Sequence, residues 1–152
     1  MPNSSASKTQ ARFAAAFIGG SLLHVLSPQP VAAQEFGVRV VGIDHPVGEI
    51  LAALCSPDEY PKGRCAFLAS VPVRGMEAWI RFNGVAPGTY ALKIFQDLNG
   101  DRVLNRGLFG IPKEPIGFGN DAEPKGGPPD FDAAAVRVDD AHADTLVTLR
   151  TQ

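Results

Sequence analysis

The chain has 152 residues, of which 45% are hydrophobic and 20% are charged, and its formal net charge is -2. This apolar content excludes a disordered acidic or basic tail, because enough side chains can be buried to offset the entropy lost on folding. The charge balance also excludes the strongly basic composition of nucleic-acid-binding domains, so we expect no nucleic-acid partner. A chain of this length predicts one domain.

Residues 1–33 have the three-part layout of a secretory signal peptide. Lys8 and Arg12 precede an uncharged apolar run over residues 13–26, and small residues ending at Ala33 provide a cleavage site. A membrane anchor is the alternative, but it needs about 20 apolar residues, and this run is shorter and followed by prolines. We therefore expect cleavage after Ala33 and a periplasmic or secreted protein.

The expected mature domain covers residues 34–152 and carries 12 basic and 16 acidic side chains, a net charge of -4. We expect it to be soluble, with no transmembrane span. Its two cysteines, Cys55 and Cys65, form an even pair, which in an exported protein predicts a disulfide. A bridge over so short a loop is expected to stabilise the fold by roughly 2–3 kcal/mol. The spacing does not fit a CxxC redox or zinc site.

Seven short strands are predicted in the mature domain, because β-branched and alternating apolar residues recur between turn signals. The predicted strands cover residues 36–43, 48–54, 67–73, 76–82, 89–96, 133–138 and 145–150. No long window after the signal peptide has the 3.6-residue apolar period of a helix. The pattern predicts an all-β fold, a single seven-stranded antiparallel β-sandwich of immunoglobulin-like or prealbumin-like type.

One long segment, residues 107–129, interrupts this rhythm with 11 glycines or prolines among its 23 residues. It also carries several large apolar side chains, so we expect an ordered loop that packs on itself against one end of the sandwich. Ordered loops often carry binding residues. The candidate partner surface on this loop consists of Phe109, Ile111, Glu114, Phe118 and Asn120.

The turn after the fifth predicted strand has oxygen-bearing residues at alternate positions, as calcium loops do. The candidate calcium ligands are Asp97, Asn99, Asp101, Val103 (through its carbonyl) and Asn105. Arg102 replaces the glycine of an EF-hand loop and Leu108 its final glutamate, and both replacements oppose this interpretation. The alternative is a turn whose Asp and Asn side chains cap backbone groups.

Catalytic signatures are weak in this sequence. Glu114 and Asp121 could act as an acid/base pair in a hydrolase or lyase, but solvated loop carboxylates are the more common case. His45 and His142 both lie in predicted turns. The sequence has no G-x-S-x-G, H-E-x-x-H or P-loop motif, so we expect a protein that is not an enzyme.

Five sequence blocks resemble an exported bacterial family catalogued as domain of unknown function 2141. The blocks are PGTYAL (87–92), DLNG (97–100), FGIPKE (109–114), GFGN (117–120) and GPPDFDAA (127–134). The resemblance covers most of residues 36–150 and departs from the usual family pattern at Asp101, Arg102, Asn105 and Gly119. It implies an exported β-sandwich in which the acidic turn is coupled to the FGIPKE loop, and it implies no assigned activity.

The leading hypothesis is an exported, non-catalytic β-sandwich with a binding or structural role in the cell envelope or outside the cell. Its ligand, an unidentified protein or small molecule, is expected to bind the end of the domain that carries residues 97–131. A calcium-stabilised structural module and a hydrolase or lyase remain the alternatives. No cofactor is expected, apart from Ca²⁺ in the first of these alternatives.

Overall fold

The computed structural model describes residues 33–152, so the predicted signal peptide lies outside the described residues except for Ala33. The regular structure of the described chain consists of eight β-strands and two short 3-10 helices. In chain order the elements are β1 (Gln34–Val41), β2 (Glu49–Cys55), β3 (Phe67–Pro72), β4 (Ala78–Val85), β5 (Gly88–Asp97), η1 (Leu108–Gly110), β6 (Ile116–Phe118), η2 (Gly119–Asp121), β7 (Ala135–Val138) and β8 (Asp144–Thr148). Among residues 33–152, no helix is long and apolar enough to cross a membrane.

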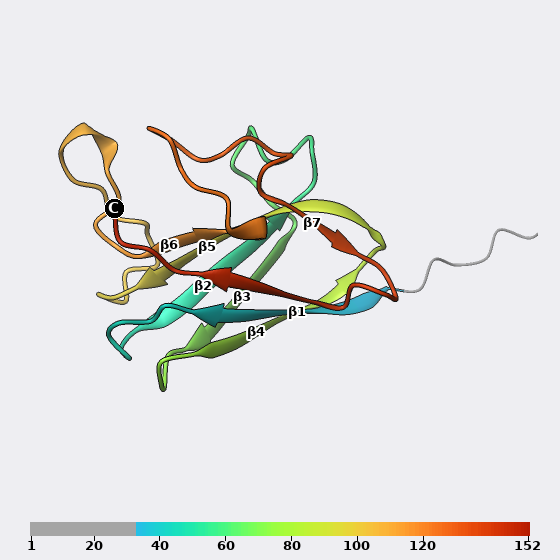
Figure 1. Cartoon of the computed structure of the whole chain (residues 1–152), viewed down its shortest axis with the longest axis horizontal. Helices are drawn as coiled ribbons and strands as arrows, with labels where there is room; N and C mark the ends of the chain where they lie inside the picture. The colour runs from blue at the N-terminus through green and yellow to red at the C-terminus, as the bar shows by residue number, and fades with distance from the viewer. Residues whose placement is uncertain (1–32) are drawn as a thin grey trace, which may run out of the picture.

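The strands form two sheets (Figure 1). The smaller sheet has the order β4-β1-β8, and the larger has the order β3-β2-β5-β6, with β7 paired to the first half of β5. Alternate residues of β1 (Phe36, Val38 and Val40) are fully buried, as expected of a strand with one face on the core. They join Leu92 and Ile94 of β5 and further apolar residues of both sheets in the main core.

A second apolar cluster lies on the opposite face of the larger sheet. Because successive side chains of a strand point to opposite faces, Ala91 and Phe95 of β5 face away from the main core that buries Leu92 and Ile94. Chain segments outside the strands cover these outward residues. The cluster residues contributed by the covering segments and by β6 are Tyr60, Leu104, Ile116, Phe118, Ala122, Phe131 and Ala134.

The predicted all-β class is confirmed, but the predicted strand count is wrong. The structure has eight strands, and the additional strand is β6, which pairs with β5 from Lys93↔Phe118 to Phe95↔Ile116. Strand β6 is only three residues long and lies within the Gly/Pro-rich segment 107–129, so it is too short to be predicted from an alternating pattern. The predicted fourth strand also begins too early, since Met76 is 58% exposed and β4 starts at Ala78.

One strand pairing contradicts the prediction of a purely antiparallel fold. Strands β1 and β8 run parallel, with a register from Gly37↔Asp144 to Val41↔Thr148. The reason is that the chain leaves β7 in the larger sheet, turns at Asp139–His142 and enters β8 in the smaller sheet. Strands β7 and β8 are therefore not a hairpin within one sheet. Instead, β8 lies beside β1 and runs in the same direction.

Strand β6 connects the two sheets at one edge. Its residue Ile116 exchanges two backbone hydrogen bonds with Arg150, which follows β8, at N···O distances of 3.0 and 2.8 Å. This close approach requires a glycine at the next position. A Cβ atom at Gly117 would lie 2.6 Å from Val147 Cγ1 and 3.0 Å from the Thr148 carbonyl oxygen.

We predict that Gly117→Ala destabilises the protein by about 1–3 kcal/mol, because the added methyl group would force β6 away from β8. Gly127→Ala is the matched control, since no atom lies within 4 Å of a Cβ at that position. Denaturant unfolding of the two variants measures the difference. Equal stability of both variants would contradict the close packing of β6 on β8.

Candidate functional site

The outer face of the larger sheet carries a groove with an ordered floor. Strand registers place its outward-facing side chains in two rows that cross all four strands. The first row is Ser70, Leu51, Phe95 and Ile116, and the second row is Leu68, Ala53, Lys93 and Phe118. Six of these eight side chains are apolar, so the floor resembles the lining of a ligand site more than an ordinary solvent-facing sheet.

The groove floor borders a cavity of about 690 Å³, walled on one side by Arg102, Leu104 and Arg106 and on another by Pro128. A second cavity of about 140 Å³ continues from it toward the tip at Phe109 and Ile111. The two cavities share lining residues, which makes them parts of one groove. The shared residues are Leu104, Arg106, Ile116, Phe118 and Pro128.

The first wall is the acidic turn that begins at Asp97. The Asp97 side chain is fully buried, and its two carboxylate oxygens accept hydrogen bonds from the backbone N–H groups of Gly100 and Arg102, at 2.8 and 2.7 Å. Such bonds from a buried carboxylate to backbone donors are among the stronger ones in proteins. Asp97 therefore fixes the shape of the turn.

The remaining polar side chains of the turn bind one another. Asn99 Nδ2 donates to Asp101 Oδ2 at 2.9 Å and to Asn105 Oδ1 at 2.8 Å, and Asp101 Oδ1 accepts from the Val103 N–H at 2.8 Å. The hydrogen bond from Asn105, followed by those from Val103 and Asn99, lowers the pKa of Asp101 below its ordinary value. The side chains of the candidate calcium ligands thus bind groups of the turn itself, and Val103 takes part through its N–H group.

Glu114 clamps this turn from outside. It is only 4% exposed, and its oxygens accept hydrogen bonds from the N–H groups of Leu98 and Asn105, at 3.0 and 2.9 Å. Within residues 33–152, no group of three or more His, Cys, Asp or Glu side chains is arranged to hold a metal ion. Calcium binding stays a prediction. The carboxylates of Asp97 and Glu114 accept hydrogen bonds from backbone N–H groups.

Asp121, the other carboxylate considered for catalysis, binds a different part of the chain. Its oxygens accept hydrogen bonds from the Thr148 N–H at 2.7 Å and from Thr148 Oγ1 at 3.1 Å. Glu114 binds the 98–105 turn, whereas Asp121 binds β8, and neither belongs to the described residues that line the groove. The structure does not bring the two carboxylates together at one site.

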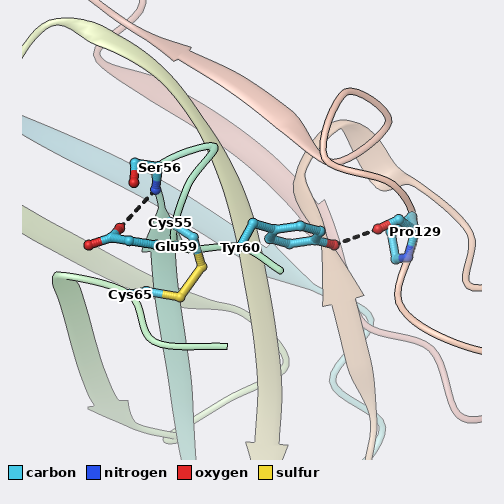
Figure 2. Close-up of a disulfide and its surroundings, with 6 residues drawn as sticks. All are labelled: Cys55, Ser56, Glu59, Tyr60, Cys65 and Pro129. Carbon is cyan, nitrogen blue, oxygen red and sulfur yellow. Dashed lines mark hydrogen bonds between the residues drawn. A yellow bond between two sulfur atoms is a disulfide. The ribbon is translucent and has the colours of Figure 1, made fainter. Parts of the chain in front are cut away.

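The predicted pairing of Cys55 with Cys65 is present, with the two sulfur atoms 2.02 Å apart (Figure 2). The loop between them carries Tyr60, which projects toward the segment after η2. There the Tyr60 hydroxyl donates a hydrogen bond to the Pro129 carbonyl oxygen at 2.6 Å, and its ring packs edge-on against Phe131. The disulfide loop thus holds the segment that contributes the Pro128 wall.

The predicted loop surface is only partly assembled. Phe118 is 7% exposed and lies in the floor of the groove, and Ile111 lines its outer end. Glu114 is the buried clamp described above, and Asn120 is exposed beside a separate hollow.

The expectation that the whole loop packs on itself is wrong at Phe109, which is 97% exposed. The tip closes through its backbone instead, with hydrogen bonds from the Gly107 N–H to the Ile111 carbonyl oxygen at 2.7 Å and from Arg106 Nη1 to the Gly110 carbonyl oxygen at 2.8 Å. With Phe109 at φ 62° and Gly110 at φ 75°, the tight turn forms without burying the aromatic ring.

Comparison with known proteins gives a match over residues 38–145 to the family described as "Uncharacterized protein conserved in bacteria (DUF2141)". The chain belongs to this family. The resemblance inferred from the sequence blocks is therefore confirmed. No curated protein and no solved structure gives a significant match.

In this DUF2141 member, the residues of the groove floor on β2, β3 and β5 were missed by sequence reasoning. The alternation within 89–96 by itself predicts a single buried face, formed by Tyr90, Leu92 and Ile94. A signal was available, since the nearly continuous apolar runs of β2 (EILAALC) and β5 (YALKIF) are typical of strands covered on both faces.

We predict that Glu114→Gln destabilises the protein by about 1–3 kcal/mol, because an amide offers a single acceptor oxygen to the two backbone N–H groups that Glu114 binds. Glu123→Gln, at an exposed position of the following loop, is the control and should change stability by less than about 0.5 kcal/mol. Denaturant unfolding at neutral pH compares the variants. If Glu114→Gln matched its control, the clamp would not contribute to stability.

A second prediction concerns pH. Burial, and next the negative charge of Asp130, raise the pKa of Tyr60 above its ordinary value of 10.0. The folded state then holds the phenolic proton more tightly than the unfolded state does. This contribution to stability is present below the unfolded pKa and is lost as the pH rises through the folded one.

The measurement is the tyrosinate absorbance of the wild type minus that of Tyr60→Phe, followed from about pH 8 to about pH 12. We expect the difference to titrate above the ordinary tyrosine pKa, and unfolding experiments should show stability falling over the same range. Ionisation of Tyr60 at or below the ordinary value would contradict the burial of its ring and its position beside Asp130.

Proposed function

We propose that this protein is an exported, non-catalytic β-sandwich of immunoglobulin-like or prealbumin-like type that binds an apolar small-molecule ligand. The proposed site is the groove over β3, β2, β5 and β6, closed at one end by residues 97–131. One observation carries the proposal: a cavity of about 690 Å³ lies over two rows of mainly apolar side chains. Cavities of about 300–1,000 Å³ with such a lining are typical of small-molecule sites.

Exposure of the floor supports a binding role. Leu68 is 74% exposed at the open side of the groove, while Phe118 at the opposite side is 7% exposed. An apolar surface that is contiguous, concave and partly open to water costs solvation free energy unless a ligand covers it. The loops bury the β6 side of the outer face and leave the β2–β3 side free for a ligand.

The lining of the groove supports a non-catalytic role. Its one hydroxyl among the described residues of the floor, Ser70 Oγ, accepts a hydrogen bond from Arg102 Nη2 at 3.0 Å. The residues within 33–152 that line the main cavity include no His, Asp or Glu side chain that would serve as a general base beside it. Export is supported by the leader-like sequence and by the disulfide, which is characteristic of oxidising compartments.

We predict that the neutral apolar dye Nile red binds the folded protein and that Ala53→Trp abolishes this binding, because an indole at the centre of the floor would fill the groove. Ala141→Trp, at an exposed position of the β7–β8 turn, is the matched control and should bind the dye like the wild type. Dye fluorescence gives the affinity, and thermal unfolding shows that each variant is folded.

Two results would contradict the proposed site. Nile red that fails to bind the wild type would leave the groove without a demonstrated affinity for apolar ligands. Equal binding by Ala53→Trp and Ala141→Trp would place the dye elsewhere on the surface.

A further inference from the structure

Lys93 is the one charged side chain in the two rows that form the groove floor. Its direct neighbours across the sheet are Ala53 on β2 and Phe118 on β6, both apolar. The next outward residue along β5 is Phe95. An amino group in this position can keep its charge at low cost only if a partner compensates for the water it has lost.

The protein supplies Lys93 with a weak partner. Its Nζ atom lies 5.2 Å from the centre of the Tyr60 ring, a cation–π arrangement, and none of the ion pairs among residues 33–152 involves Lys93. Burial lowers the pKa of Lys93 below its ordinary value, in keeping with a charge that is desolvated and incompletely compensated. A ligand with a negative group would provide the missing counter-charge.

The charge of the other residues that line the groove also favours an anionic ligand. In the described part of the chain the charged lining residues of the main cavity are Lys93, Arg102 and Arg106, all cationic, although the expected mature domain has a net charge of -4. Arg102 is already paired with Glu49 at 3.4 Å, and Arg106 donates to the Gly110 carbonyl oxygen. Lys93 and Arg106 therefore take part in none of the ion pairs among the described residues, and Lys93 is the one of the two that lies in the groove floor.

We propose that the ligand of this groove is an amphipathic anion: an extended apolar body with a terminal carboxylate or similar acidic group that pairs with Lys93. The apolar body would lie over the half-buried Leu51 and Phe95 and the exposed Leu68, on the open side of the groove, where it covers exposed hydrocarbon. The acidic group would replace the water that the Lys93 amino group has lost. This inference rests on the proposed function and adds the chemical class of the ligand.

The experiment compares two probes of equal chain length, decanoate and 1-decanol, as competitors of Nile red. We expect the wild type to bind decanoate at least about tenfold more tightly than decanol, as one charge-assisted contact allows. Lys93→Met keeps the apolar stem and should lose about tenfold in decanoate affinity while binding decanol unchanged. Lys93→Arg should retain the preference for decanoate.

The control variant is Lys62→Met, which removes an exposed lysine of the disulfide loop outside the groove. It should keep the wild-type preference for decanoate, which would show that loss of any one positive charge is not enough. Thermal unfolding establishes that each variant is folded. If Lys93→Met does not fold, the decanoate-to-decanol ratio of the wild type and of Lys93→Arg decides the question.

The outcomes separate this inference from the proposed function. If both probes displace Nile red equally from the wild type, or if Lys93→Met keeps the preference, the groove binds apolar ligands and the anionic class is wrong. If Nile red binds but neither probe displaces it, the anionic class is also wrong. If Nile red itself does not bind, the proposed function fails.

Discussion

Strand β5 buries apolar side chains on both of its faces, and this constraint shapes everything outside the main core. Leu92 and Ile94 pack toward the smaller sheet, whereas Ala91 and Phe95 face outward. A sheet with two apolar faces needs a second covering layer, because exposed hydrocarbon costs roughly 25 cal/mol per Å². Three segments provide that layer: the disulfide loop, the turn after Asp97 and the segment that follows β6. They cover the outer face of the sheet incompletely. The uncovered remainder is the groove.

The covering segments are held by polar contacts that a sheet ladder does not provide. On one side, the buried carboxylates of Asp97 and Glu114 accept hydrogen bonds from four backbone N–H groups of the turn. On the other, Tyr60 joins the disulfide-closed loop to Pro129. Walls fixed in this way lose little conformational entropy when a ligand binds, which favours affinity. These contacts also hold residues that are far apart in the sequence around one cavity.

Much of the fold could be predicted from the sequence, because period-two alternation and turn residues are local signals. They located seven strands to within a few residues, and the paired cysteines predicted the disulfide. Strand β6 and the parallel β1–β8 pairing depend on where distant segments meet, so no local pattern predicts them. Glu114 illustrates the same limit: its sequence suggests a solvated loop carboxylate, and its burial follows from the position of the 98–105 turn. The error at Phe109 is the opposite one. An apolar side chain in an ordered loop predicts burial, but the tip closes through its backbone and leaves the ring exposed.

The central claim is that the outer face of the larger sheet is a ligand site. Backbone amide chemical shifts of the protein, recorded while Nile red is added, test it most directly. The claim predicts shifts concentrated in β2, β3, β5 and β6 and in the turn at residues 102–106, with β1, β4 and β8 unchanged. Shifts confined to the smaller sheet or to the exposed tip at Phe109, or no shifts at all, would contradict it.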